Sequence, residues 1–201
     1  MRGKIIKSTG MLCTVMADDG TKKECRVKGS FRIKNIKTTN PIAVGDFVEF
    51  KFDQKENTGI IEKIEPRKNY IIRKSINLSK QSHIIAANVD MAFLLITLKQ
   101  PRTSYGFIDR FLITAEAYHI PTSLVFNKMD IYNEKEIKEV DEMILLYQKI
   151  GYPSYKISAT KKNISELKQD MENKTSLLSG HSGVGKSTLA NALNPALNIK
   201  T

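Results

Sequence analysis

The sequence predicts a β + α/β protein in which a small β-barrel of the OB-fold type precedes a parallel α/β domain with a phosphate-binding loop. The first 65 residues contain short apolar segments separated by Gly, Asn and Asp, a pattern typical of short strands joined by turns. From Ala86 onward, apolar runs alternate with helical periodicity, which indicates a parallel sheet covered on both faces. The sequence GHSGVGKS at 180–187 has the GxxxxGK[ST] form of a P-loop and lies between a strand-like and a helix-like segment.

The N-terminal segments predict about five short strands that close into a barrel. Asp18-Asp19-Gly20 is a hairpin signal, and Phe47–Phe52 alternates apolar with other side chains. Further strands are expected at 4–7, 12–16, 24–27, 31–33 and 60–64. An OB-fold fits this spacing best, and an SH3-like barrel is the competing architecture. We expect the barrel to occupy residues 1–68.

A polar and basic segment over 69–85 is predicted to link the barrel to the α/β part, residues 86–201. Strands are expected at 89–97, 122–126, 153–157 and 175–179, and helices at 134–150, 163–171 and 186–193. Another helix is indicated by Phe107, Phe111, Ala115 and Tyr118, whose spacing places them on one helix face. The alternation of strands and helices predicts a parallel sheet for this part.

The charge of the chain is unevenly distributed. The net charge is +11, and residues 1–85 carry 18 Lys and Arg against 9 Asp and Glu, a net +9. Residues 86–201 carry 14 against 12, a net +2. A basic module beside a nearly neutral one indicates that the first part binds a polyanion. The alternative interpretation is a lysine-rich surface that only keeps the protein soluble.

The cysteine and histidine pattern argues against a zinc site built by this chain. Cys13 and Cys25 are the only cysteines, they lack CxxC spacing, and no histidines cluster near them. We expect both cysteines to be reduced and half-buried, as in a cytosolic protein. The N-terminus has no signal-peptide pattern, and the longest apolar run, near Met91–Ile96, is too short to span a membrane. The sequence therefore predicts a soluble cytoplasmic protein.

The residue types of the P-loop each have a chemical reason. Gly180, Gly183 and Gly185 let the backbone curl so that successive N–H groups point at phosphate oxygens. Lys186 can supply a positive charge to the β- and γ-phosphates, and it is the candidate catalytic residue. The Ser187 hydroxyl can coordinate Mg²⁺, and the N-terminus of the following helix adds its dipole. The pattern predicts a nucleotide site.

A second motif, Asn-Lys-Met-Asp at 127–130, predicts that the base is guanine. It follows an apolar strand, at a place where an α/β sheet exposes ligand-binding loops. The Asp130 carboxylate can accept hydrogen bonds from guanine N1–H and the 2-amino group, whereas adenine lacks both donors. The mismatch would leave buried polar groups unpaired, so the loop can discriminate strongly. Taken alone, the tetrapeptide could also be an ordinary turn.

The supporting residues of this base site can also be assigned. Asn127 is expected to brace its loop, and the Lys128 stem is expected to pack along the base. Ser-Ala-Thr at 158–160 follows the next strand, and this position suits donation of the Ala159 N–H to guanine O6. We expect the three loops to converge on one nucleotide.

The order of these motifs resembles that of the RsgA/YjeQ family of circularly permuted GTPases. In ordinary small GTPases the phosphate loop comes first, whereas here 127–130 precedes it, a basic OB-like module lies in front, and Ala86-Ala-Asn-Val-Asp90 opens the second part. The resemblance covers essentially all 201 residues. It implies a GTPase of late 30S ribosomal subunit maturation, stimulated by that subunit and bound to 16S rRNA through residues 1–85, cytoplasmic and monomeric.

The resemblance and the motifs together assign the site. The expected nucleotide-binding residues are Asn127, Lys128, Met129, Asp130, Ser158, Ala159, Gly180, His181, Ser182, Gly183, Val184, Gly185, Lys186, Ser187 and Thr188. His181 is expected to fill the loop rather than to act in catalysis. The expected cofactors are GTP or GDP and Mg²⁺, the metal being bound through Ser187. In the sheet of such a domain the four strands would be contiguous and parallel, and further strands would join beyond the phosphate-loop strand.

The chain also departs from the family pattern. Family members continue with a switch threonine, a DxxG motif and a zinc-binding C-terminal domain, none of which residues 189–201 supply. We therefore expect the chain to represent part of such a protein, with zinc confined to the absent domain, an exposed sheet edge and little hydrolysis by residues 1–201. The alternative function is a non-catalytic RNA-binding module gated by guanine nucleotides. An ATP-dependent P-loop kinase would prefer adenine, which Asp130 disfavours.

Overall fold

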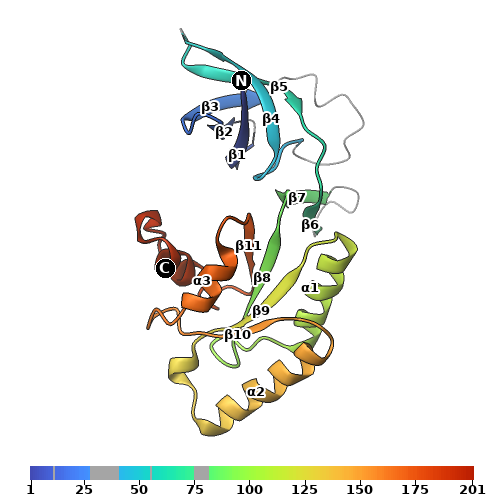
Figure 1. Cartoon of the computed structure of the whole chain (residues 1–201), viewed down its shortest axis with the longest axis vertical. Coiled ribbons are helices and arrows are strands. Elements are labelled where there is room, and N and C mark those ends of the chain that lie inside the picture. Colours follow the sequence, from blue (N-terminus) through green and yellow to red (C-terminus); the bar gives the residue numbers. More distant parts are fainter. Residues whose placement is uncertain (11, 28–40, 55, 75–81) are drawn as a thin grey trace. The chain divides into compact units, whose positions relative to one another are not determined.

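The structure, a computed structural model, describes residues 1–10, 12–27, 41–54, 56–74 and 82–201. The chain divides into two compact units, Met1–Val89 and Asp90–Thr201. Figure 1 shows a strand-built barrel in the first and a sheet with helices in the second. No helix within the described ranges is long and apolar enough to cross a membrane.

The first unit contains a closed barrel of five strands. The strands are β1 (Arg2–Thr9), β2 (Leu12–Ala17), β3 (Lys22–Val27), β4 (Phe47–Asp53) and β5 (Thr58–Ile64). They pair in the order β1-β2-β3-β5-β4, and β4 closes on β1. β3 is parallel to β5, whereas the other pairs are antiparallel. This is the OB-fold order and confirms the prediction, because the meander of an SH3-like barrel would pair β3 with β4.

Alternation along the strands builds the core of the barrel. The inward side chains are Ile5, Cys13, Val15, Ala17, Cys25, Val27, Ile42, Val48, Phe50 and Ile61. Both cysteines are free thiols that lie opposite each other across β2 and β3, and they are fully buried rather than half-buried as expected. Burial raises the pKa of Cys13 to about 12 and that of Cys25 to about 11. Both thiols are therefore protonated at neutral pH, which makes them poor nucleophiles.

A two-stranded antiparallel sheet occupies the segment expected to be a linker. Its strands are β6 (Tyr70–Lys74) and β7 (Ser82–Ala87). Asn69 and Asn88 anchor the base of this hairpin: Asn69 Nδ2 donates to the Val89 carbonyl at 2.8 Å, and Asn88 Nδ2 donates to the Gly45 carbonyl at 3.0 Å. The residues between the two strands, and the strand expected at 31–33, lie outside the described residues.

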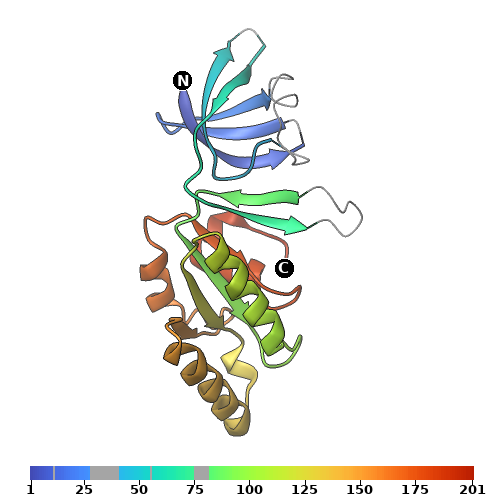
Figure 2. The same cartoon turned by 90° about the vertical axis from the view of Figure 1, so that its right-hand side faces the viewer.

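The second unit is a parallel sheet of four strands with helices on both faces (Figures 1 and 2). The strands are β8 (Met91–Ile96), β9 (Thr122–Phe126), β10 (Ser154–Lys156) and β11 (Ser176–Ser179). The helices are α1 (Tyr105–Ala117), α2 (Glu134–Lys149), α3 (Ser165–Met171) and α4 (Lys186–Leu193). The strand order is β10-β9-β8-β11, so the predicted strands are contiguous and β11 lies at an edge.

Two apolar layers cover the two faces of this sheet. Phe93 and Leu95 of β8 pack in the cluster that contains α3 and α4 side chains, and Leu94 and Ile96 pack in the cluster with α1 and α2. Figure 1 shows the corresponding pairs of helices on opposite faces. A strand covered on both sides is apolar throughout, which explains the continuous run at 91–96.

Helix α1 begins where its cap allows. Ser104 Oγ accepts a hydrogen bond from the Phe107 N–H at 3.3 Å, as an N-cap residue does. The buried stripe of α1 consists of Ile108, Leu112 and Ala115. Of the residues expected on one helix face, Ala115 is buried, and Phe107 and Phe111 pack partly buried against the cluster that includes Ile108 and Leu112. Helical spacing therefore predicted the helix correctly, and the buried Ile108 and Leu112 lie next to two of the expected positions.

The parallel strands bring their C-terminal ends to one edge of the sheet. The loops that leave this edge are 97–104 after β8, 127–133 after β9, 157–163 after β10 and 180–185 after β11. Three of these loops carry the sequence motifs, so the fold gathers residues that are far apart in the chain.

Candidate nucleotide-binding site

The phosphate loop, residues 180–185, joins β11 to α4. Gly180 and Gly185 have φ values of 141° and 98°, which side-chain-bearing residues rarely adopt. Space excludes a side chain as well: a Cβ on Gly180 would lie 2.6 Å from the Leu95 carbonyl oxygen, and one on Gly185 would lie 2.4 Å from Asn127 Nδ2. The loop is therefore a bare backbone curl at a helix N-terminus, the arrangement that binds phosphate.

Lys186 folds back over the phosphate loop. Its Nζ donates to the carbonyl oxygen of Gly180 at 2.9 Å and to that of His181 at 2.7 Å. An ammonium group has a third donor, which remains for a phosphate oxygen. The His181 ring packs on Phe107 of α1 with the ring centroids 3.8 Å apart, which attaches the loop to that helix.

Asn127 connects the motif loops directly. Its side chain is buried at the end of β9; Nδ2 donates to the Val184 carbonyl oxygen at 2.9 Å, and Oδ1 accepts the Ala159 N–H at 3.1 Å. The Asn127 carbonyl oxygen accepts from the Tyr132 hydroxyl at 3.1 Å, and that hydroxyl accepts the Leu98 N–H at 2.8 Å. Asn127 thus braces more than its own loop, since it ties all of the motif loops together.

Asp130 is held by the hydroxyl groups of the loop at 158–160. Ser158 Oγ donates to Asp130 Oδ1 at 2.5 Å, and Thr160 Oγ1 donates to Oδ2 at 3.3 Å. The hydrogen bond from Ser158 is the main cause that lowers the pKa of Asp130 below its usual value. The carboxylate is therefore ionised at neutral pH and can accept hydrogen bonds from N–H groups of a base. The Ala159 N–H, expected to meet guanine O6, is donated to Asn127 here, and the O6 contact stays a prediction.

The loop at 97–104, which sequence analysis did not single out, borders two motif loops. Lys128 Nζ donates to the Gln100 carbonyl oxygen at 2.5 Å. A Cβ on Gly183 would lie 3.4 Å from Pro101 Cδ, so this loop also packs against the phosphate loop. Its contacts use a backbone carbonyl and a proline ring, which leave no motif in the sequence.

Two ion pairs connect helix α2 to the loop at 97–104. Lys99 Nζ lies 2.8 Å from Glu136 Oε1, and Arg102 Nη2 lies 3.1 Å from Glu139 Oε1. Glu136 also closes the capping box of α2 with Asn133. The helix start and the loop beside the phosphate site are therefore fixed by the same carboxylate.

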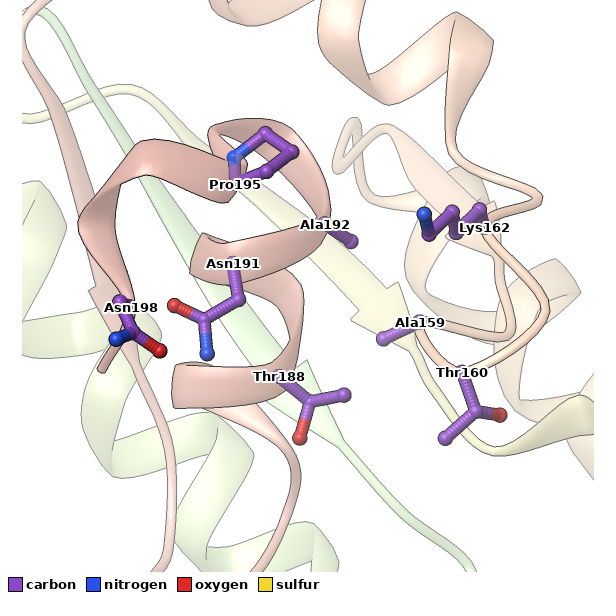
Figure 3. Close-up of a pocket in the computed structure, with 8 residues that line it drawn as sticks. All are labelled: Ala159, Thr160, Lys162, Thr188, Asn191, Ala192, Pro195 and Asn198. Carbon is purple, nitrogen blue, oxygen red and sulfur yellow. The ribbon is translucent and has the colours of Figure 1, made fainter. Parts of the chain in front are cut away.

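A pocket of about 320 Å³ opens beside the loop at 158–160 (Figure 3). Its lining residues are Ala159, Thr160, Lys162, Thr188, Asn191, Ala192, Pro195 and Asn198. Of these, only Ala159 and Thr188 belong to the predicted nucleotide-binding set. Figure 3 shows the α4 residues on one side and 159–162 across from them.

The described residues of the barrel include several exposed cations. Some cations are paired: Arg2 with Glu65, Lys51 with Glu62 and Lys63 with Glu49 form ion pairs of 2.7, 2.9 and 2.8 Å. Other exposed cations, Lys7, Lys22 and Arg26, have no ion pair among the described residues.

In the part of the chain that the structure describes, no cluster of three His, Cys, Asp or Glu could hold a metal ion.

Two family models and several curated proteins match the sequence of this chain. The model of the RsgA GTPase family matches residues 64–201, and that of the RsgA N-terminal domain matches 2–61. The small ribosomal subunit biogenesis GTPase RsgA 2 of Bacteroides thetaiotaomicron is 54% identical over the whole of this chain and 65% of its own length. The corresponding RsgA of Flavobacterium psychrophilum is 56% identical, again over the whole of this chain, and 63% of that protein is covered.

Solved structures show the same likeness. The crystal structure of YjeQ from Thermotoga maritima is 37% identical with a TM-score of 0.79, over 99% of this chain and 66% of that one. The structure of YloQ, described as a circularly permuted GTPase, is 30% identical with a TM-score of 0.71, over 97% and 64% of the two chains. The chain spans about 65% of the length of the curated relatives it matches. It belongs to the RsgA GTPase family and contains that family's N-terminal domain ahead of the GTPase region.

Proposed function

We propose that this chain is the nucleotide- and RNA-binding part of a GTPase that acts in late biogenesis of the 30S ribosomal subunit. Its relatives carry the name small ribosomal subunit biogenesis GTPase. The observation that carries the proposal is the Asn127 side chain, which joins the phosphate loop to the loop at 158–160. One ligand can therefore place a base edge at Asp130 and a diphosphate at 180–187.

Guanine selectivity is supported by the state of Asp130. Its carboxylate is held by Ser158 and is ionised at neutral pH, so it offers acceptors to guanine N1–H and the 2-amino group. Adenine would place the lone pair of its N1 against the Asp130 carboxylate, and neither group would then have a hydrogen-bond donor. Lys128, Met129 and Ala159 complete the proposed base site.

The phosphate loop and Lys186 have the shape and charge that a diphosphate requires. Gly180 and Gly185 lie where a Cβ would collide with neighbouring atoms, so the backbone can approach a phosphate closely. Lys186 already stands over the loop and would contact the β- and γ-phosphates, and the Ser187 hydroxyl would hold Mg²⁺. When bound, the metal would supply further positive charge to the phosphates. The remaining members of the proposed site, His181, Ser182, Val184 and Thr188, complete the curl and the first turn of α4.

The barrel would hold 16S rRNA within the 30S subunit. The excess of positive charge lies in residues 1–85, and Lys7, Lys22 and Arg26 are exposed on this unit. We propose that the chain consists of a barrel at 1–68, a connection at 69–85 and a GTPase region at 86–201. We also propose that the protein acts in the cytoplasm as a monomer. Binding to a 16S rRNA fragment should weaken steeply with added salt, because cations on phosphates release counterions.

Competition of GDP against ADP tests the nucleotide assignment. The chain should bind GDP at least about 100-fold more tightly than ADP. Asp130→Asn should remove most of this preference, whereas Asp170→Asn, on α3, should leave it intact. Equal affinity of the unchanged chain for GDP and ADP would refute guanine recognition.

Turnover separates the GTPase from the non-catalytic alternative. GTP hydrolysis is measured with and without purified 30S subunits, for residues 1–201, for the complete protein and for Lys186→Ala in the complete protein. The GTPase proposal expects stimulation by the subunit in the complete protein and little turnover by residues 1–201 alone. A complete protein that binds GTP but never hydrolyses it with the subunit present would favour the gated RNA-binding module.

A further inference from the structure

We infer that Tyr132 is a positioning residue for guanine recognition. Its hydroxyl group holds the base-reading loop, which we define as residues 127–131, against the loop at 97–104. The inference rests on the proposed function, because it assigns to Tyr132 the placement of residues within the same nucleotide site. No sequence motif marks Tyr132, which follows the Asn-Lys-Met-Asp tetrapeptide by two positions.

The two loops leave neighbouring strand ends of the sheet. β8 and β9 are adjacent parallel strands (Figure 1). Their last residues, Ile96 and Phe126, pair in register, so the loop at 97–104 and the base-reading loop start side by side. Because the two loops share this starting point, a hydrogen bond between them farther along fixes the position of one relative to the other.

The Tyr132 hydroxyl bonds to both strand ends beyond this point. It donates to the Asn127 carbonyl oxygen at 3.1 Å and accepts the Leu98 N–H at 2.8 Å. Burial raises the pKa of Tyr132 above its ordinary value, so the hydroxyl stays protonated and able to donate. A phenylalanine ring would fill the same volume in the core, but it would leave a carbonyl oxygen and an N–H without this partner.

The Tyr132 ring is held on several sides. The residue is 8% exposed and belongs to the apolar cluster between the sheet and helices α1 and α2. Lys99 Nζ lies 5.7 Å from the ring centroid, a cation–π distance, and the same ammonium group pairs with Glu136 of α2. The hydroxyl therefore projects from a ring whose position is fixed, as a positioning group requires.

A second hydrogen bond joins the base-reading loop to the loop at 97–104. Lys128 Nζ donates to the Gln100 carbonyl oxygen. The φ of Lys128 is 68°, a left-handed conformation that few residues other than glycine adopt. The bonds made by Tyr132 and Lys128 thus hold the base-reading loop, with its left-handed turn, against one and the same neighbour.

Removal of the hydroxyl should affect the base end of a bound nucleotide more than its phosphate end. The Asn127 side chain keeps its bonds to Val184 and Ala159 when Tyr132 is changed, so the phosphate loop keeps that anchor. The base-reading loop, in contrast, loses a bond that fixes the backbone next to Lys128.

The test measures the affinities of GDP, ADP and pyrophosphate by displacement of a fluorescent GDP analogue. Tyr132→Phe should weaken GDP binding about fivefold, the size expected for a lost hydrogen bond, and should lower the preference for GDP over ADP. Its affinity for pyrophosphate, which carries only the phosphate tail, should not change.

Tyr147→Phe is the matched control. Tyr147 is buried in the same apolar cluster as Tyr132, but its hydroxyl donates to Asp109 of α1 at 2.8 Å, and neither residue belongs to a motif loop. The control variant loses the same chemical group from the same core, so it should leave the affinities for all three ligands unchanged.

Lys128→Met tests the same connection without changing the core. It removes the ammonium group that bonds the Gln100 carbonyl oxygen but retains an aliphatic stem. If both bonds hold one loop, Tyr132→Phe should weaken GDP binding less in the Lys128→Met chain than in the unchanged chain. Fully additive losses would show that the two side chains act independently, and they would overturn the inference.

Three other results would also overturn it. These are an unchanged GDP affinity in Tyr132→Phe, equal losses for GDP and pyrophosphate, and equal losses of GDP affinity in Tyr132→Phe and Tyr147→Phe. The second result would mean a disturbed phosphate loop, and the third would assign the effect to the core. If the unchanged chain shows no preference for GDP over ADP, the proposed function itself fails and the inference fails with it, which is a separate outcome.

Discussion

Asn127 Nδ2 donates a hydrogen bond to the Val184 carbonyl oxygen at 2.9 Å, across 57 positions of the sequence. The same side chain accepts the Ala159 N–H, so one buried amide satisfies a group in each of two other loops. The relationship depends on where the strands end in the sheet and not on the order in which the chain visits them. This is why a permuted sequence can retain the geometry of a nucleotide site.

Replacing Asn127 should therefore separate the loops. Asn127→Ala leaves the Val184 carbonyl and the Ala159 N–H without their partner and should lower the free energy of unfolding by about 2 kcal/mol. Asn127→Asp keeps an acceptor for the Ala159 N–H but places a carboxylate oxygen against the Val184 carbonyl oxygen. It should therefore lower the free energy of unfolding at least as much as Asn127→Ala. Urea denaturation and GDP titration measure both effects. Near-wild-type GDP affinity in both variants would show that the bridge is dispensable.

Gly185→Ala should abolish GDP binding, and Gly151→Ala should not. Both glycines have a left-handed φ, 98° and 93°, so both variants carry a similar backbone cost of about 1–2 kcal/mol. A Cβ at Gly185 also lies 2.4 Å from Asn127 Nδ2, whereas nothing lies within 4 Å of one at Gly151. The difference in GDP affinity between the two variants isolates this contact, and equal affinities would contradict it.

The pH range of GDP binding should depend on Ser158. The pKa of folded Asp130 is lowered, so its charge persists through neutral and mildly acidic pH and is lost only as the pH falls through that lowered value. Ser158→Ala removes the main cause of the lowering, so the loss of GDP affinity on acidification should begin at higher pH. Thr160→Val removes the longer hydrogen bond and should shift the profile less. GDP titrations from pH 7 to about pH 4, near the ordinary Asp pKa, measure this; superimposable profiles for all three proteins would argue against the role.

Arg67→Ala should destabilise the barrel while leaving the nucleotide site intact. Asp46 is fully buried and receives two bonds from Arg67, at 2.6 and 2.7 Å, and a third from the Ala43 N–H at 2.8 Å. Removing the guanidinium leaves a buried charge unpaired, which costs about 3–5 kcal/mol. Lys63→Ala breaks an exposed pair and serves as the control, with little expected change. Urea denaturation followed by circular dichroism measures the difference; a similar midpoint for both variants would count against it.

Much of the fold could be predicted because it follows from local pattern. The continuous apolar runs of β8 and β9 indicate strands that are buried on both faces. The glycines of the phosphate loop indicate backbone conformations that other residues rarely adopt. The spacing of apolar residues predicted helix α1, but Phe107 is as apolar as Ile108, and only the neighbouring elements decide which of the two is fully buried. The β6–β7 hairpin was not predicted, because the polar and basic residues of 69–85 were interpreted as a linker although the strands themselves, YIIRK and SHIIAA, contain neighbouring isoleucines.

The sequence by itself determined the two-part architecture, the parallel sheet and the identity of the motif loops, because periodicity, glycine positions and charge are properties of neighbouring residues. Only the tertiary structure decided that Asn127 joins those loops, that Ser158 holds Asp130, and that the loop at 97–104 borders the loop at 127–130. These contacts link residues far apart in the chain, largely through backbone carbonyls and N–H groups. Every residue has such groups, so no pattern of side chains could reveal which of them would meet.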